Sequence, residues 1–297
     1  MEINVSKYSD KYSFPIIGAS YIGAPRANTA MFVSKKVGKL IEALNGVSDC
    51  LVFAENGIEV SDEILDKHCF VFSLNPQCEY AKFTELFYIE EENHNSSVGY
   101  DDVGCGVYIS KSASIGENSK IEPGVIIGPG VIIGNNARIN AGSVIKNATI
   151  GDNVIINEKA VIGANGFTMA DDAEGNKIRI YSLGRVIIGN NVEIGAHDNV
   201  SRGSGGDTVI DDSVKIDALV HIGHDAHLHK NVEITAGAVV GGFVNALEGS
   251  YIGINAVIRN RVTLGSHCFV GMGATVTKSV DDDITVVGNP AKPFERK

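Results

Sequence analysis

Isoleucine, valine and leucine recur at every sixth residue through the second two-thirds of the chain. This period matches neither the 3.6 residues of a helical turn nor the two-residue alternation of an isolated strand. It suits a chain that turns a corner every six residues and buries one aliphatic side chain at each corner. The longest unbroken series consists of Ile210, Ile216, Ile222, Leu228, Ile234, Val240, Ala246, Ile252, Ile258, Leu264, Val270 and Val276.

Three six-residue corners close one coil, so the pattern predicts a parallel β-helix of stacked hexapeptide repeats, a mainly β fold. Each coil takes about 18 residues, and neighbouring backbones lie about 4.8 Å apart. Residues 164–184 and 201–207 interrupt the period, and we expect both segments to loop outward because a coil cannot absorb extra residues. An earlier series with one slip consists of Ile109, Ile115, Ile121, Ile127, Ile133, Ile139, Ile145, Ile150, Ile156 and Ile162, and Ile188, Ile194 and Val200 follow.

The first third of the chain has a different pattern and predicts a small α/β domain over residues 1–99. Residues 35–44 and 75–87 are patterned as helices, whereas "CLVFA" and "CFVFS" are patterned as short buried strands. The polar, acidic stretch at residues 89–99 is the expected linker to a β-helix domain over residues 100–297.

An acidic composition limits the function classes. The formal net charge is −11 and the isoelectric point is near 5.2, which argues against a protein that binds the phosphates of a nucleic acid. The sequence shows neither a secretory leader nor an apolar run approaching the roughly 20 residues that span a bilayer. We therefore expect a cytoplasmic protein without a membrane span, whose five scattered cysteines are reduced.

Four of the eight histidines fall within ten residues, "HIGHDAHLHK", at positions 221–230. Three interpretations of these histidines are possible: the HIGH signature of class I aminoacyl-tRNA synthetases, a zinc site, and a single general base. The synthetase signature works at a helix start inside a nucleotide-binding βαβ fold. These residues lie within the most regular β-helix series, so we interpret that match as coincidence.

A zinc enzyme remains an alternative, because γ-class carbonic anhydrases are also trimeric hexapeptide β-helices that bind zinc with three histidines between subunits. Residues six apart occupy different faces of such a helix, and residues 18 apart stack. His221 and His227 therefore cannot share a metal within one chain, and no second histidine lies 18 residues from any member of the cluster. We expect no metal, with His221, His227 and His229 as solvated or hydrogen-bonded surface side chains.

Residues 166–242 resemble the core of the UDP-3-O-(3-hydroxyacyl)glucosamine N-acyltransferases of lipid A synthesis, the LpxD family. The resemblance rests on the interrupting loop that begins "GFTMADD", the "GRVIIG" return to the repeat and the segment "IDALVHIGH". It extends more weakly to "MFVSKK" and "NPQCEYAKF" in the first domain, and so over most of the chain. It implies a left-handed β-helix and transfer of an acyl group to an amine.

The resemblance implies that His224 is the general base that takes a proton from the sugar's attacking amine, a role typically worth about 10²–10⁴-fold in rate. Asp217 matches a family carboxylate that would orient the imidazole or the amine. Gly242 matches the glycine whose N–H faces the developing oxyanion, and its 18-residue spacing independently places it one coil beyond His224. The alternatives are a structural histidine, a solvated aspartate and a turn glycine.

For the substrate, the resemblance implies a nucleotide-sugar site that includes Phe32, Asn165, Phe167 and His221. Near Phe32, a lysine and a glycine replace the asparagine and the aromatic residue of the family. The nucleotide is therefore left open.

The end of the sequence departs from the LpxD pattern. The family continues into helices that receive acyl carrier protein, whereas this sequence ends "VVGNPAKPFERK", which resembles hexapeptide acetyltransferases that use acetyl-CoA on nucleotide-linked sugars. We therefore expect acyl-CoA as the donor and acyl carrier protein as the alternative. The residues expected to bind the donor are Gly242, Asn260, Arg261, Ala274, Lys278, Asn289, Pro290, Ala291 and Lys292, with Arg296 as a further cation for the phosphates.

These observations predict a homotrimer, because this fold completes its sites between subunits. The predicted activity is transfer of an acyl group from a thioester to the amine of a nucleotide-activated amino sugar, for a surface glycan such as O-antigen or lipopolysaccharide. The alternatives are the lipid A enzyme itself with acyl carrier protein, the zinc hydratase, and a non-catalytic sugar-binding scaffold. The sequence specifies neither the sugar nor the length of the acyl chain. It also does not specify whether a nitrogen or an oxygen of the sugar is acylated.

Overall fold

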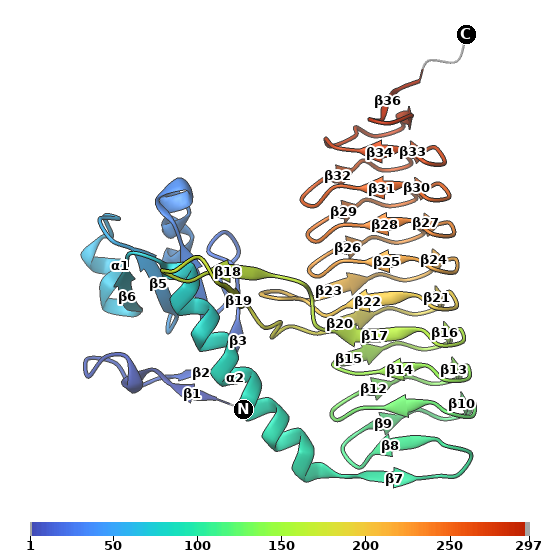
Figure 1. Ribbon diagram of the computed structural model, residues 1–297, viewed down its shortest axis with the longest axis horizontal. Coiled ribbons are helices and arrows are strands. Elements are labelled where there is room, and N and C mark those ends of the chain that lie inside the picture. The colour runs from blue at the N-terminus through green and yellow to red at the C-terminus, as the bar shows by residue number, and fades with distance from the viewer. Residues whose placement is uncertain (1, 295–297) are drawn as a thin grey trace. The chain divides into compact units, whose positions relative to one another are not determined.

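The computed structural model describes residues 2–294, which form two compact units (Figure 1). The first unit contains the chain up to His94 together with Phe167–Gly184 and Ser204–Gly206. The second unit contains Asn95–Gly166, Arg185–Gly203 and the chain from Asp207 onward. Most of the first interrupting segment, and residues 204–206 of the second, therefore group with the N-terminal residues.

The second unit is a left-handed parallel β-helix, as predicted. Each coil contributes one short strand to each of three sheets, which we call faces 1, 2 and 3 in chain order (Figure 1). Neighbouring strands pair in parallel. The exceptions lie at the two ends, where β7 pairs antiparallel with β8 and β36 pairs antiparallel with β35. Face 1 consists of β7 (Tyr100–Asp102), β8 (Tyr108–Ser110), β11 (Ile126–Ile127), β14 (Val144–Ile145), β17 (Val161–Ala164), β22 (Asn199–Ser201), β25 (His221–Ile222), β28 (Val239–Val240), β31 (Val257–Ile258) and β34 (Thr275–Val276).

The other two faces repeat the same arrangement. Face 2 consists of β9 (Ser114–Ile115), β12 (Ile132–Ile133), β15 (Ala148–Ile150), β20 (Val186–Ile188), β23 (Thr208–Ile210), β26 (His227–Leu228), β29 (Asn245–Ala246) and β32 (Thr263–Leu264). Face 3 consists of β10 (Lys120–Ile121), β13 (Arg138–Ile139), β16 (Ile155–Ile156), β21 (Glu193–Ile194), β24 (Lys215–Ile216), β27 (Glu233–Ile234), β30 (Tyr251–Ile252), β33 (Phe269–Val270), β35 (Thr285–Val287) and β36 (Lys292–Pro293).

The periodic aliphatic residues form the β-helix core. Every member of the series from Ile210 to Val276 is at most 3% exposed. Burying each isoleucine, leucine or valine of this series stabilises the fold by about 1.5–3 kcal/mol. These residues lie within the two-residue strands rather than at the corners, which corrects one detail of the prediction. The corners between strands hold residues with left-handed backbone, such as Asn231 (φ 59°) and Asn255 (φ 55°), because a tight turn needs that conformation and asparagine tolerates it.

A four-stranded parallel sheet forms the centre of the first unit, in the order β3 (Gly18–Ala19), β4 (Thr29–Val33), β5 (Leu51–Glu55) and β6 (Cys69–Ser73). The two predicted strands are confirmed as β5 and β6, but only β5 is largely buried, whereas β6 is buried only at Cys69. The helix expected at residues 35–44 is a kinked 3₁₀ segment, η2 (Lys35–Gly46), whose backbone leaves helical geometry at Val37. Smaller elements complete the unit: η1 (Val5–Lys7), α1 (Asp62–Lys67), the hairpin of β1 (Ile3–Asn4) and β2 (Pro15–Ile16), and the hairpin of β18 (Met169–Asp171) and β19 (Lys177–Arg179).

The second predicted helix is confirmed as α2 (Pro76–Val98), which is longer than expected. Asn75 caps it by accepting the Cys78 N–H, and proline fits the first helical position. The two units divide between His94 and Asn95, inside the expected linker at residues 89–99. This linker is helical up to Val98, because its glutamates are good helix formers and continue the helix. None of the described helices is long and apolar enough to cross a membrane.

Candidate functional site

His224 lies at the corner between faces 1 and 2, two residues after the end of β25. Its Nδ1 is 2.7 Å from Oδ2 of Asp225, whose side chain is only 4% exposed. A buried carboxylate accepts a hydrogen bond, so the imidazole proton resides on Nδ1 and the lone pair of Nε2 is directed away from Asp225. The side chain of His224 is 17% exposed, which leaves one edge accessible to a substrate.

Asp225 is held in place by the corner itself. Its backbone is left-handed, with φ 58°, and its N–H donates to the Oγ1 of the fully buried Thr208 at 2.8 Å. Aspartate adopts this conformation more readily than most side chains. The sequence prediction missed Asp225 as the partner of the histidine, although the two residues are adjacent in "GHDA".

Gly242 stacks one coil beyond His224, as the 18-residue spacing predicts. A Cβ atom at this position would lie 2.9 Å from His224 Nε2, so a side chain here would cover the imidazole. Among the described residues no acceptor takes the Gly242 N–H in a hydrogen bond. The backbone of Gly242 therefore lies next to Nε2 of His224.

The same corner continues toward the C-terminal end. The ring of Phe243 meets the imidazole of His224 edge-on at 5.2 Å, and the guanidinium of Arg261 lies 4.0 Å above the other ring. Asn260 is exposed beside Arg261, and Lys278 is exposed at the corner of the last coil. Four residues expected to bind the donor, Gly242, Asn260, Arg261 and Lys278, therefore lie in one column with His224.

Asp217 lies at a different corner, between faces 3 and 1, and within one chain it does not pair with His224. It is exposed and accepts the Ala218 N–H at 2.8 Å. Its charge acts on the nearby Asp198, whose pKa is raised to about 7 chiefly by burial. Within one chain, the carboxylate that contacts the His224 imidazole is that of Asp225.

The residues predicted to bind the nucleotide sugar are distributed over both units. His221 is part of β25, and partial burial together with the neighbouring His224 lowers its pKa. Asn165 is exposed at the end of β17. In the first unit, Phe32 is half-buried against the ring of Tyr80 at 5.2 Å, and Phe167 is 81% exposed.

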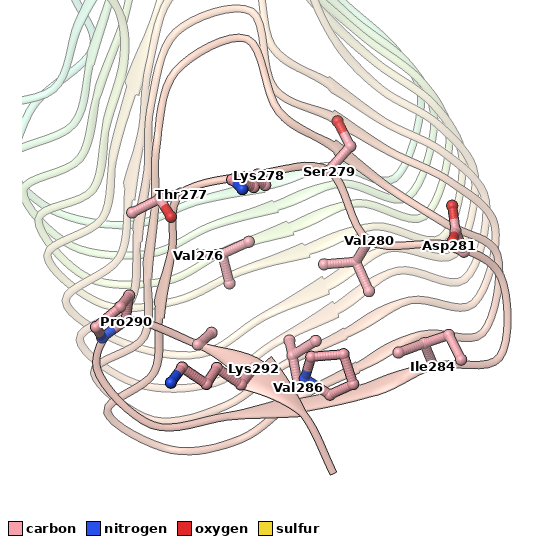
Figure 2. Close-up of a pocket in the computed structure, with 12 residues that line it drawn as sticks. Val276, Thr277, Lys278, Ser279, Val280, Asp281, Ile284, Val286, Pro290 and Lys292 are labelled. Atoms are coloured by element: carbon pink, nitrogen blue, oxygen red, sulfur yellow. The ribbon is translucent and has the colours of Figure 1, made fainter.

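The last coil opens into a pocket of about 500 Å³ at the end of the β-helix (Figure 2). Lys278, Pro290, Ala291 and Lys292 line it, around an apolar wall that includes Val276. Asn289, which is exposed, precedes Pro290.

Ala274 and Arg296 were also expected at the donor site. Ala274 is fully buried in the β-helix core, which corrects its assignment, because an inward-facing side chain cannot contact a ligand at the surface. Arg296 lies outside the described residues.

His227 and His229 make hydrogen bonds at the surface of face 2. His227 bonds to Asp211, and His229 bonds to Asn245, each at 2.9 Å. His221 lies on face 1 and His227 on face 2, which is the separation that the repeat predicts.

The fold is a left-handed parallel β-helix of hexapeptide repeats. The family model described as bacterial transferase hexapeptide (six repeats) matches residues 207–242, and the model described as GMPPB C-terminal domain matches residues 104–168. Solved structures share this fold. LpxA from Acinetobacter baumannii is 25% identical with a TM-score of 0.58, and the match covers 64% of this chain and 72% of the LpxA chain. LpxA from Bacteroides fragilis is 24% identical with a TM-score of 0.59, and the match covers 65% of this chain and 74% of that chain.

Curated relatives carry a more specific name. The UDP-3-O-acylglucosamine N-acyltransferase of Caulobacter sp. (strain K31) is 40% identical over 46% of this chain and 40% of its own length. The enzyme of the same name from Saccharophagus degradans is 50% identical over 28% of this chain and 23% of its own length. The probable UDP-3-O-acylglucosamine N-acyltransferase 2, mitochondrial, of Arabidopsis thaliana is 34% identical over 45% of this chain and 44% of its own length. The resemblance to this family is confirmed. The resemblance was expected to extend over most of the chain, but these matches span less than half of it. They also span less than half of each relative's length.

Proposed function

We propose that this protein is an N-acyltransferase whose acceptor is the glucosamine amine of UDP-3-O-acylglucosamine. The observation that carries the proposal is the arrangement at His224, where Asp225 holds Nδ1 and the Gly242 backbone adjoins Nε2. The names of the curated relatives favour this acceptor, which is the alternative of the sequence analysis, over an unspecified nucleotide amino sugar.

The chemistry follows from these groups. The amine nitrogen attacks the thioester carbonyl carbon, and Nε2 of His224 takes the proton that the nitrogen loses. Asp225 stabilises the imidazolium, and the Gly242 N–H donates to the oxyanion that forms on the carbonyl oxygen. The carbon–sulfur bond then breaks, and the departing thiolate takes the proton from the imidazolium. An amide and a free thiol are the products.

We further propose coenzyme A as the carrier of the acyl group. Lys278 lies at the same corner as His224, three coils away, which is about 14 Å at the usual strand spacing. Lys292 lines the pocket with it, so two cations are available for phosphates at one end of the column. The thioester would then lie at His224, and the pantetheine chain would follow Asn260 and Arg261.

The third element of the proposal is a homotrimer. Val239 and Val257 present half-exposed apolar side chains side by side on face 1, next to His221. Covering this row with a second subunit would also bring another chain close to His224. Analytical ultracentrifugation should give three times the chain mass of 31.5 kDa, and a monomer at micromolar concentration would remove the shared site.

The proposed function is tested by incubating the purified protein with UDP-3-O-acylglucosamine and matched 3-hydroxyacyl thioesters of coenzyme A and of acyl carrier protein. We expect an amide-linked product and a higher kcat/KM with the coenzyme A donor. Efficient use of the carrier protein alone would overturn the donor assignment but leave the acceptor intact. Turnover only with other amino-sugar nucleotides would overturn the acceptor.

A further inference from the structure

Three potential metal ligands converge on face 2, away from the corner that holds His224. Asp211 follows β23, His227 belongs to β26 of the next coil, and His229 follows β26. Their ligand atoms all lie within 4.8 Å of one another. Oδ2 of Asp211 is 2.9 Å from Nε2 of His227 and 3.5 Å from Nδ1 of His229. One carboxylate oxygen therefore faces one nitrogen of each imidazole.

We propose that Asp211, His227 and His229 form a binding site for a divalent transition metal of the Zn²⁺ class. Two imidazole nitrogens and one carboxylate oxygen are the donor set that zinc accepts with an open fourth position. Metal–ligand bonds of 2.0–2.2 Å in tetrahedral geometry separate neighbouring ligand atoms by about 3.4 Å. The two distances from Asp211, 2.9 Å to His227 and 3.5 Å to His229, bracket this value.

The orientation of His229 is already suited to a metal. Its Nε2 lies 2.9 Å from Oδ1 of Asn245, and an amide oxygen accepts the Nε2–H. The lone pair of Nδ1 is thereby directed at Asp211. Metal-bound histidines commonly donate their second N–H in this way, which fixes the tautomer.

His227 needs a larger adjustment. Facing a carboxylate, its Nε2 carries a proton, which must move to Nδ1 before Nε2 can bind a metal. The two imidazole rings are stacked, with centroids 3.8 Å apart and planes inclined by 20°. Both rings would splay so that their nitrogens point at one ion.

The surroundings allow a cation to enter. The three side chains are between 32% and 37% exposed, so a water molecule can take the fourth position. Asp212 and Lys230 line the adjoining pocket with Asp211, and their opposite charges offset each other. Because the ligands come from two successive coils, the metal would cross-link β23 to β26 and stabilise the β-helix there.

Sequence spacing contained part of this signal. Asp211 precedes His229 by 18 residues, the distance of one coil. From the sequence alone, carboxylate ligands were possible, but none was singled out. The site is independent of the proposed acyl transfer, since none of its ligands belongs to the column of His224.

The test is Zn²⁺ titration by isothermal calorimetry, on untagged protein stripped with EDTA, with Mg²⁺ as the contrasting cation. We expect one Zn²⁺ per chain, no comparable Mg²⁺ binding, and a rise in Tm on adding Zn²⁺. Asp211→Asn, which preserves the size of the side chain, should weaken Zn²⁺ binding at least tenfold and abolish the rise, as should His229→Gln.

Two controls separate this site from other histidines. His197→Asn alters an exposed histidine at another corner, where asparagine tolerates the left-handed backbone (φ 62°), and should leave Zn²⁺ binding unchanged. His224→Ala should do the same. Unchanged Zn²⁺ affinity in Asp211→Asn and His229→Gln, or loss of binding in His224→Ala alone, would overturn the proposal.

Discussion

At the scale of single residues, the choice of partner for His224 decides which of its nitrogens can act as a base. The side chain of Asp225 is almost fully buried and bonds to Nδ1, so the proposed base is Nε2, beside Gly242. A carboxylate so placed keeps the imidazole in one tautomer and stabilises its positive charge after proton transfer. Asp225 is therefore a positioning residue.

Asp225→Asn should lower kcat about a hundredfold and change KM little, because the amide can still accept from Nδ1–H but carries no charge to stabilise the imidazolium. Steady-state kinetics at saturating donor measure both constants. Asp217→Asn is the matched comparison, since it removes the exposed carboxylate that the sequence favoured. A loss of kcat in Asp217→Asn with none in Asp225→Asn would return the orienting role to Asp217.

At the scale of the elements, the repeat explains what the sequence could and could not predict. The period of six identified the buried side chains because each coil repeats one environment, and it placed Gly242 on His224 because residues 18 apart stack. The His224–Asp225 contact depends on a left-handed corner that periodicity does not reveal. The ends of α2 and the 3₁₀ form of η2 were missed because local polarity predicts them poorly.

One buried carboxylate links two coils and gives the β-helix a pH dependence. Asp198 is 1% exposed and accepts the N–H groups of Val220 at 2.7 Å and Gly195 at 2.8 Å. Burial, aided by the charge of Asp217, raises its pKa from 3.8 to about 7. The folded state therefore keeps this proton over a range in which the unfolded chain has lost it.

The stabilising contribution of protonated Asp198 should be complete below about pH 4 and disappear as pH rises through about 7, at most a few kcal/mol. Urea unfolding of the wild type and of Asp198→Asn between pH 4 and 8 measures the difference. We expect the wild type to lose stability relative to the variant as pH rises. An identical pH profile in both proteins would show that Asp198 titrates normally when folded.

At the scale of the whole molecule, the chain combines a β-helix with a compact α/β unit that also includes Phe167–Gly184. The interrupting segments were predicted from the broken period, but their membership of the first unit was not, because periodicity carries no information on what an insertion packs against. There, Ala170 and Ile180 pack with Phe53 and Phe83 in one apolar cluster. The insertion is thus part of a second core.

The central claim is that Nε2 of His224 takes the proton from the amine during acyl transfer. Its most direct test is the rate of amide formation on UDP-3-O-acylglucosamine by the wild type, by His224→Ala and by His267→Asn, a control at another exposed left-handed corner. We predict that His224→Ala lowers kcat by at least about a hundredfold while the fold is retained by circular dichroism, and that His267→Asn stays within about twofold of the wild type. Full turnover by a folded His224→Ala protein would contradict the claim.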